Sequence, residues 1–220
     1  MKVKILYFDN HLIAAEKPFG IPTQPVQGFS ENLENSVKEW VREEFKKTGN
    51  IFLHAVHRLD RVAGGIVIFA KTDKALSKMN ELVRKHMVKK TYFAILDNTP
   101  KNPHGVLKHF LKHDSRFSKV SNHPKDNYKE AILEYEVMSI GLSKNCMVKI
   151  NLTTGRYHQI RSQFGHIGCP VAGDTKYGSK INLGKNEIAL FHQSVTFIHP
   201  IKKEEINISA ELPKYKVWDI

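Results

Sequence analysis

The 220-residue chain predicts an α+β fold, in which a mixed, mainly antiparallel β-sheet carries flanking helices. Short segments of alternating apolar and polar residues recur along the chain, which is typical of strands with one buried face. A few longer segments place apolar residues at helical spacing instead. No internal repeat or linker separates these segments, so we expect one domain over residues 1–220.

The order of the elements follows from these patterns and from the turn-forming residues between them. Strands are expected at residues 4–18 (two, joined by a turn at Asp9 and Asn10), 64–72, 89–96, 130–140, 145–154, 188–200 and 204–212. Helices are expected at residues 31–47, 73–86 and 155–168. Thr72 suits the N-cap of the second helix, because its hydroxyl can accept a backbone N–H bond. Residues 99–127 are rich in Pro, His and Lys, which predicts a hairpin with a long basic loop.

The chain is strongly basic, with 34 Lys and Arg against 22 Asp and Glu, a net charge of +12 and a pI near 9.6. Such an excess favours a polyanionic partner or serves solubility, and charge alone does not choose between them. Cys146 and Cys169 lack the spacing of metal ligands, which fits a reducing compartment. The N-terminal residues form no signal-peptide core, and no window holds 18 uninterrupted apolar residues. We therefore expect a cytoplasmic protein that does not enter a membrane.

One acidic residue stands in a basic setting in the segment "AVHRLDRVAGG", where Asp60 lies between Arg58 and Arg61. It follows a strand-like run and precedes two glycines, a place where functional side chains are often displayed. One interpretation is a turn-capping carboxylate that accepts backbone N–H bonds. The other is a catalytic carboxylate, which the flanking arginines would keep ionised and therefore able to act as a nucleophile or base.

A second candidate segment is "GRYHQIRSQFGHIG", which presents Arg156, His158, Gln159 and Arg161 within six residues. If the segment is helical from its start, His158 and Arg161 share a face at i, i+3 spacing. The segment is then either a basic helix that is solvated or lies on a phosphate backbone, or it aims Arg161 into a cleft. In the second case, Arg161 can pair bidentately with Asp60.

Tyr92 is the third candidate, in the strand-like segment "KKTYFAIL" after Lys89 and Lys90. A tyrosine in such a strand usually buries its ring and leaves its hydroxyl wet. The functional alternative is a ring that stacks on a nucleobase while the two lysines contact phosphates.

Other kinds of chemistry lack their motifs. The twelve histidines form no HExxH motif and no Cys/His set at zinc spacing. The tetrapeptide "HRLD" is superficially like a kinase catalytic loop, but the spaced Asn, a DFG segment and a glycine-rich phosphate loop are missing. No GxSxG nucleophile elbow is present. We therefore expect a site that uses no metal and no cofactor.

Taken together, the chain resembles the RluA-like family of RNA pseudouridine synthases. Its opening "YFDNHLIAAEKPFGIPTQP" is similar to the family's strand pair with an "NKPxG" turn, and "HRLDRVAGGIVIFAKT" is similar to "HRLDxxTSGLLLFAK". The segments "KKTYFAIL", "GRYHQIRSQFGHIGCPVAGDTKYG" and "ALFHQSVTFIHP" resemble three further family motifs in the same order. These five motifs cover nearly the whole chain.

The resemblance implies the pseudouridine synthase catalytic fold with a central basic cleft, which isomerises uridine in structured rRNA or tRNA. It implies Asp60 as the catalytic carboxylate, Tyr92 as a base-stacking ring and Arg161 as the partner of Asp60. Gly173 and Asp174 are implied to shape the adjacent loop. The resemblance also implies that Arg58 helps to hold the RNA helix open after the target base leaves, and that Leu190 or its neighbour Phe191 lines the pocket. The candidate RNA-binding residues are Lys17, Arg58, Lys89, Lys90, Arg156, His158, Gln159, Leu190 and Phe191.

The chain also departs from the family pattern. Ala63 and Gly64 replace a Thr-Ser pair, Gln163 replaces a His, and Glu16 stands where Asn is common. The first change removes two hydroxyls beside the catalytic loop. Many relatives carry an S4-type RNA-binding module before the catalytic domain, whereas strand-like residues start here within the first five, so we expect no S4 module. We expect a monomer, and the chief alternative function is a non-catalytic RNA-binding protein that uses the same cleft.

Overall fold

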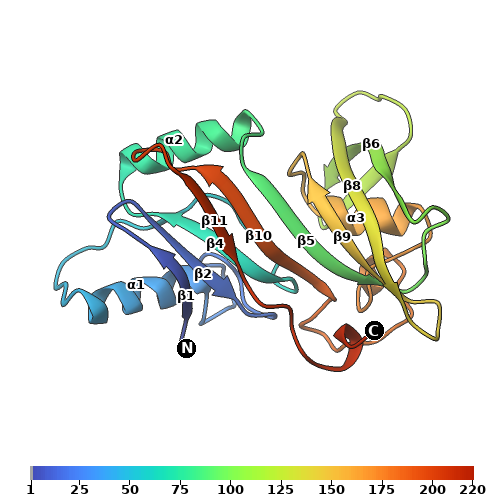
Figure 1. Ribbon diagram of the computed structural model, residues 1–220, viewed down its shortest axis with the longest axis horizontal. Coiled ribbons are helices and arrows are strands. Elements are labelled where there is room, and N and C mark those ends of the chain that lie inside the picture. The colour runs from blue at the N-terminus through green and yellow to red at the C-terminus, as the bar shows by residue number, and fades with distance from the viewer. Residues whose placement is uncertain (1) are drawn as a thin grey trace. The chain divides into compact units, whose positions relative to one another are not determined.

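The computed structural model describes residues 2–220 and divides into two compact units, which are considered separately below (Figure 1). The first unit comprises the chain up to Val88 together with His192–Glu211, and the second comprises Lys89–Phe191 and Leu212–Ile220. The expected α+β class is confirmed: both units combine helices with antiparallel strand pairs. The organisation as one functional domain stays a prediction.

In the first unit, strands from both ends of the chain lie in one sheet region (Figure 1). The strand order is β1-β2-β4-β10, with β3 paired to β4 and β11 paired to β10. The bounds are Lys4–Phe8 for β1, Leu12–Lys17 for β2, His54–Ala55 for β3, Gly64–Ala70 for β4, Leu190–Ile198 for β10 and Glu205–Ser209 for β11. The predicted strands of this unit are thereby confirmed, and the two-residue β3 lies in the strand-like run that precedes Asp60.

Two capped helices accompany this sheet. Helix α1 spans Leu33–Glu44 and α2 spans Asp73–Arg84. The expected N-cap of α2 is confirmed, because the Thr72 hydroxyl accepts a hydrogen bond from the amide of Ala75 at 3.2 Å. The apolar face of α1 packs on strands β2 and β4 in a core cluster of Ile13, Ala15, Leu33, Val37, Val41, Leu53, Val67 and Phe69.

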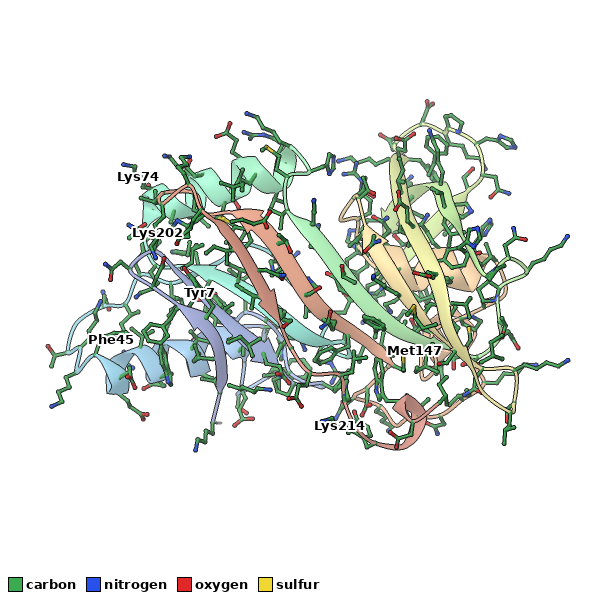
Figure 2. All side chains as sticks on the ribbon, in the orientation of Figure 1. Tyr7, Phe45, Lys74, Met147, Lys202 and Lys214 are labelled. Carbon is green, nitrogen blue, oxygen red and sulfur yellow. The ribbon has the colours of Figure 1, made fainter. Side chains whose placement is uncertain are left out.

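The turn between β1 and β2 is built around a largely buried carboxylate, Asp9. Its Oδ1 atom accepts hydrogen bonds from the amides of His11 and Leu12, both at 2.8 Å. Its Oδ2 atom contacts Tyr7 and Lys202, which are labelled in Figure 2, at 2.9 and 3.0 Å. Burial alone would raise the pKa of Asp9, but these hydrogen bonds outweigh burial and lower it below the usual range.

His199 joins the same network in its neutral form. Its Nδ1 atom accepts hydrogen bonds from the amides of Ile201 and Lys202, so the ring proton is on Nε2, which lies 3.0 Å from the Asp9 carboxylate. Burial lowers the pKa of His199, which favours this uncharged state. The network ties the β1–β2 turn to the chain that follows β10.

Asp9→Asn should lower the free energy of unfolding by about 2 kcal/mol at pH 7, because the amide cannot replace the charge facing Lys202. The lowered pKa means that the Asp9 contribution is complete above the unfolded-state pKa and is lost as pH falls through the folded-state pKa. Denaturant titrations of both proteins from pH 7 to pH 3 check this. The difference in unfolding free energy between wild type and Asp9→Asn should become smaller below about pH 4. A difference that stays constant with pH would contradict the stabilising role of the ionised Asp9 carboxylate.

The second unit contains a meander of antiparallel strands in the order β5-β9-β8-β6-β7. The bounds are Lys89–Leu96 for β5, His104–Asp114 for β6, Phe117–Ser121 for β7, Lys129–Ile140 for β8 and Cys146–Leu152 for β9. The expected long basic loop within residues 99–127 is wrong. Strand β6 takes up 11 of these residues and turns directly into β7 through Ser115, which adopts a left-handed conformation with φ of 52°.

The helix of this unit is shorter than its sequence pattern predicts. Helix α3 spans Gln159–His166, whereas residues 155–168 were expected. His158 adopts a left-handed conformation with φ of 51° and ψ of 28°, so it is the N-cap residue and lies outside the helix. The predicted helical face shared by His158 and Arg161 is therefore wrong. Two 3₁₀ turns, η1 (Thr175–Tyr177) and η2 (Lys216–Trp218), complete the unit.

The two cysteines, Cys146 and Cys169, are both unpaired and buried. Within residues 2–220, no helix is both long enough and apolar enough to cross a membrane.

Candidate active site

The loop that carries Asp60 connects β3 to β4 in the first unit. Asp60 is half-buried and Arg58 is exposed. The backbone turns back at this point, since the amide of Ala63 donates to the Asp60 carbonyl at 3.1 Å. The loop is thus a tight turn that presents the carboxylate at a partly accessible position.

The residue before Asp60 is held by one hydroxyl. Thr23 Oγ1 donates to the Leu59 carbonyl at 3.2 Å and accepts from the Leu59 amide at 3.1 Å. Thr23 is buried, so water does not compete for these bonds. The backbone of Leu59, directly before Asp60, is therefore fixed to the loop that follows β2.

The residue after Asp60 is held by the same loop. The Arg61 carbonyl accepts from Lys17 Nζ at 3.0 Å and from the Gly20 amide at 2.9 Å. In return, the Arg61 guanidinium donates to the Gly20 carbonyl at 3.1 Å and lies over the Phe29 ring at 5.3 Å. Asp60 thus lies between two residues that are each bonded to residues 17–23.

Lys17 was expected to contact RNA, but its side chain is buried inside the protein. Its side chain is 0% exposed, and Nζ also donates to the carbonyls of Pro18 and Ile21 at 2.9 and 2.8 Å. Burial lowers the pKa of Lys17 to about 7, against the opposing effect of the Asp60 charge. Since its three donors are engaged by backbone carbonyls, Lys17 holds the loop and is not available to phosphate.

Behind the loop, two histidines and a glycine pack strand β4 against β10. The Ile68 amide donates to His57 Nε2 at 3.3 Å, and the His57 ring meets the His192 ring edge-on at 5.3 Å. At Gly65, with φ of 111°, a Cβ atom would lie 2.3 Å from the His192 carbonyl oxygen. Glycine is required at this close approach, which the paired glycines after the "HRLD" segment signal in the sequence.

In the second unit, Tyr92 lies in β5 opposite Ile150 of β9, and its side chain is 7% exposed. Lys89 is exposed at the start of the same strand, while Lys90 is half-buried and burial lowers its pKa. Leu190 and Phe191, the residues expected to line a pocket, are both buried. Of this group, Lys89 has the accessibility that a phosphate contact needs.

Arg161 is buried in α3 and forms a bidentate ion pair with Asp174. Its Nε donates to Oδ2 at 2.6 Å and its Nη2 donates to Oδ1 at 2.9 Å. Both side chains are nearly inaccessible, at 6% and 1% exposed. The fork geometry fixes the guanidinium plane, so its remaining edge has a defined direction. The sequence-based account gave Asp174 a part in shaping the loop but missed this direct bond.

The ring of Tyr177 completes the setting of Arg161, because the guanidinium carbon lies 5.3 Å from the ring centroid. The Tyr177 hydroxyl accepts from the Ser118 amide at 2.8 Å and lies 2.9 Å from His158 Nδ1. The adjacent loop turns at Gly173, where φ is 85° and a Cβ atom would lie 2.9 Å from the Glu187 carbonyl oxygen. The expected shaping role of Gly173 has this steric basis.

The other candidates of the "GRYHQIR" segment form bonds within the protein. Gln159 is buried; its Oε1 accepts from Thr154 Oγ1 and the Arg156 amide, and its Nε2 donates to the Ile132 carbonyl. His158 is also buried, with its ring stacked at 3.9 Å on that of Tyr157. These contacts differ from the expected RNA contacts of Gln159 and His158. Arg156 is exposed, and its Nε donates to the Glu130 carbonyl at 3.0 Å.

The structure therefore places Asp60, Arg58 and Lys17 in the first unit, and Tyr92 and Arg161 with the other candidates in the second. The predicted pairing of Arg161 with Asp60 joins the two units and stays a prediction. Among residues 2–220, no group of three His, Cys, Asp or Glu side chains is placed to hold a metal ion.

Comparison with known proteins decides the family. A family model described as RNA pseudouridylate synthase matches residues 11–166, which include the Asp60 loop, Tyr92 and Arg161. The chain belongs to this family.

Named relatives of this pseudouridine synthase extend over almost all of the chain. It is 30% identical over 215 residues to the ribosomal large subunit pseudouridine synthase C of Rickettsia prowazekii, covering 96% of this chain and 68% of that protein. It is 28% identical over 231 residues to the tRNA pseudouridine synthase C of Haemophilus influenzae, covering 96% and 93%.

The fold is also found among solved structures. Human RNA pseudouridylate synthase domain containing 4 superposes with a TM-score of 0.79 at 22% identity, over 96% of this chain and 89% of that one. The α+β architecture described above is therefore the fold of these synthases. The family model and the named relatives show that the protein is an RNA uridine-to-pseudouridine isomerase.

In this pseudouridine synthase, Asp174→Asn should cost about 3 kcal/mol of unfolding free energy, because it leaves the Arg161 charge buried with a neutral partner. Asp114→Asn is a matched control in the same unit, where an exposed ion pair with Lys119 is lost. Denaturant unfolding checks both. The control should unfold close to the wild-type midpoint, and an Asp174→Asn midpoint equally close to wild type would contradict the expected cost of leaving the Arg161 charge buried beside a neutral side chain.

Proposed function

We propose that this pseudouridine synthase isomerises a uridine of large-subunit ribosomal RNA, with Asp60 as the catalytic carboxylate. The observation that carries the assignment is the Asp60 loop: a half-buried carboxylate whose neighbours on both sides are hydrogen-bonded to residues 17–23. The name of the Rickettsia prowazekii relative supports the choice of ribosomal RNA. The proposal includes a cytoplasmic monomer and a reaction that needs no metal or cofactor.

The chemistry asks for one well-placed carboxylate. Isomerisation breaks the N1–C1′ bond, turns the uracil while it stays bound, and joins C5 to C1′; N1 gains a proton and C5 loses one. No atom or electron is supplied from outside. Asp60 can attack C1′, or it can remove the C2′ proton to give a glycal intermediate, and both routes use the ionised form. In either route, Arg161 is the proposed partner that orients the carboxylate.

Binding must first bring the uridine out of its stack, which costs a few kcal/mol. Stacking on Tyr92 would return about 1 to 3 kcal/mol, and phosphate contacts of exposed Arg58, Lys89 and Arg156 would supply the rest. Because Tyr92 is 7% exposed, its ring has to be uncovered as the RNA binds. The buried residues Lys17, Gln159 and His158 act in this proposal by supporting the site, not by contacting RNA.

A tRNA substrate is the second candidate, because the chain matches 93% of the length of the Haemophilus influenzae relative named for tRNA. A comparison of purified large-subunit rRNA with purified tRNA as substrates separates the two. A non-catalytic RNA-binding protein is disfavoured, since a carboxylate between Arg58 and Arg61 weakens the attraction for phosphate and has no use in binding alone.

Asp60→Asn should abolish turnover and leave RNA affinity within about threefold, because the change is isosteric and removes the reacting oxygen anion. Tritium release from [5-³H]uridine-labelled RNA measures turnover, and filter binding measures affinity. Asp73→Asn, at the first turn of α2, is the matched control and should retain activity. Tritium release by Asp60→Asn at the wild-type rate would refute the catalytic role.

Arg58→Ala and Lys89→Ala should each weaken RNA binding and each reduce the slope of log K against log salt by about 1, since each would remove one phosphate contact. Lys74→Ala, which changes an exposed lysine of α2 (Figure 2), is the control. Affinity measured between 50 and 300 mM salt gives the slopes. A slope unchanged from wild type would show that the residue does not face the RNA.

A further inference from the structure

Thr23 lies in the loop "KPFGIPT" after β2, and its side chain is 3% exposed. Its single oxygen atom is both donor and acceptor for one peptide residue, the carbonyl and the amide of Leu59 at 3.2 and 3.1 Å. Among small side chains, a hydroxyl provides both functions on one atom. The Thr23 hydroxyl thereby satisfies both backbone groups of Leu59, the residue directly before Asp60, as a neighbouring strand would.

Thr23 is itself anchored to the core of the first unit. Its carbonyl accepts from the Glu34 amide at 3.0 Å, and the Pro22 carbonyl accepts from the Leu33 amide at 3.0 Å. These are the first-turn amides of α1, which have no partner within the helix. Leu33 belongs to the core cluster, and Leu59 packs against that cluster. A continuous path of short bonds therefore runs from helix α1 through Thr23 to Leu59.

We propose that Thr23 is a positioning residue of the isomerisation: through the backbone of Leu59, its hydroxyl sets the direction in which the Asp60 carboxylate points. The inference rests on the proposed role of Asp60. Lys17 and Gly20 already fix the Arg61 side of the turn, so the Thr23 bonds remove the remaining freedom on the Leu59 side.

The consequence concerns rate more than binding. A carboxylate that must reach C1′ or the C2′ proton loses about 10- to 100-fold in rate when it is displaced by about 1 Å. Thr23 does not need to contact RNA to have this effect, because it is buried beneath the loop. The expected signature is a lower rate constant at saturation with an unchanged half-saturating concentration.

The test compares wild type, Thr23→Val, Thr23→Ser and Thr72→Val in single-turnover tritium release. The substrate is [5-³H]uridine-labelled total RNA from cells that lack this protein, so the result does not depend on which RNA is the natural one. Thr23→Val keeps the shape and removes both bonds, whereas Thr23→Ser keeps the hydroxyl. Thr72→Val is the stability control, because it removes the N-cap bond of α2 in the same unit. Melting temperatures are measured for all four proteins.

Thr23→Val should lower the saturating rate constant about 10- to 100-fold, with the half-saturating enzyme concentration within about twofold of wild type. Thr23→Ser should restore the rate to within about threefold, and Thr72→Val should keep the wild-type rate although its melting temperature falls. A normal rate for Thr23→Val, no rescue by serine, or an equal loss in Thr72→Val would each overturn the inference. If Asp60→Asn is inactive while Thr23→Val is normal, this inference alone fails; if Asp60→Asn is active, the proposed function fails first.

Discussion

Asp60 can serve as a reacting group if its turn holds a single conformation. That conformation is fixed by hydrogen bonds to the residue before Asp60 and to the residue after it. Thr23 holds Leu59, while Lys17 and Gly20 hold Arg61. Asp60 itself is half-buried. The bonds that fix its neighbours are made by backbone groups and by the side chains of Thr23 and Lys17, so these bonds use none of the Asp60 carboxylate oxygens. In the proposed mechanism, residues 17–23 therefore affect catalysis through the backbone.

In the second unit, an ion pair fixes the orientation of the candidate side chain, Arg161. Arg161 is fixed by two bonds to Asp174, with both side chains close to fully desolvated, and by the ring of the half-buried Tyr177. Such a buried pair is a poor source of stability, because desolvation offsets most of the attraction. Its benefit is geometric, since a bidentate pair fixes the guanidinium plane. The Tyr177 hydroxyl extends this order to Ser118 in the β6–β7 hairpin, so the loop after α3 and the hairpin are positioned together.

Local patterns in the sequence predicted the elements that depend on local physics. The Thr72 cap, the strands of alternating residues and the turn at Asp9 all follow from side-chain spacing and turn chemistry. The left-handed His158 did not follow, because the apolar period of its segment is helical and the interruption is set by contacts with Tyr157 and Tyr177. The length of β6 was hidden by its lysines and histidines, which occupy both faces of the strand, with Lys108 exposed and His109 buried.

Some residues of the candidate site could be predicted from the sequence and others could not, because the partners of the latter are set by the tertiary fold. Asp60 stood out as a lone carboxylate among arginines, and the motif resemblance named it. Lys17 and Gln159 were expected to contact RNA, yet the partners of their side chains include backbone carbonyls and amides that meet them after folding. Spacing in sequence carries no information on such partners. The Arg161–Asp174 pair, 13 residues apart, was likewise set by the turn at Gly173 and not by helical period.

The most direct measurement of the central claim is the crystal structure of the Asp60→Asn protein bound to an RNA that contains the target uridine. The account predicts a flipped uridine whose C1′ or C2′ atom lies about 3 to 3.5 Å from an oxygen or nitrogen of the residue at position 60. It also predicts that Leu59 and Arg61 keep their bonds to Thr23 and Lys17. A bound uridine with its ribose more than about 6 Å from residue 60 would contradict the account, because no route through this carboxylate could then operate.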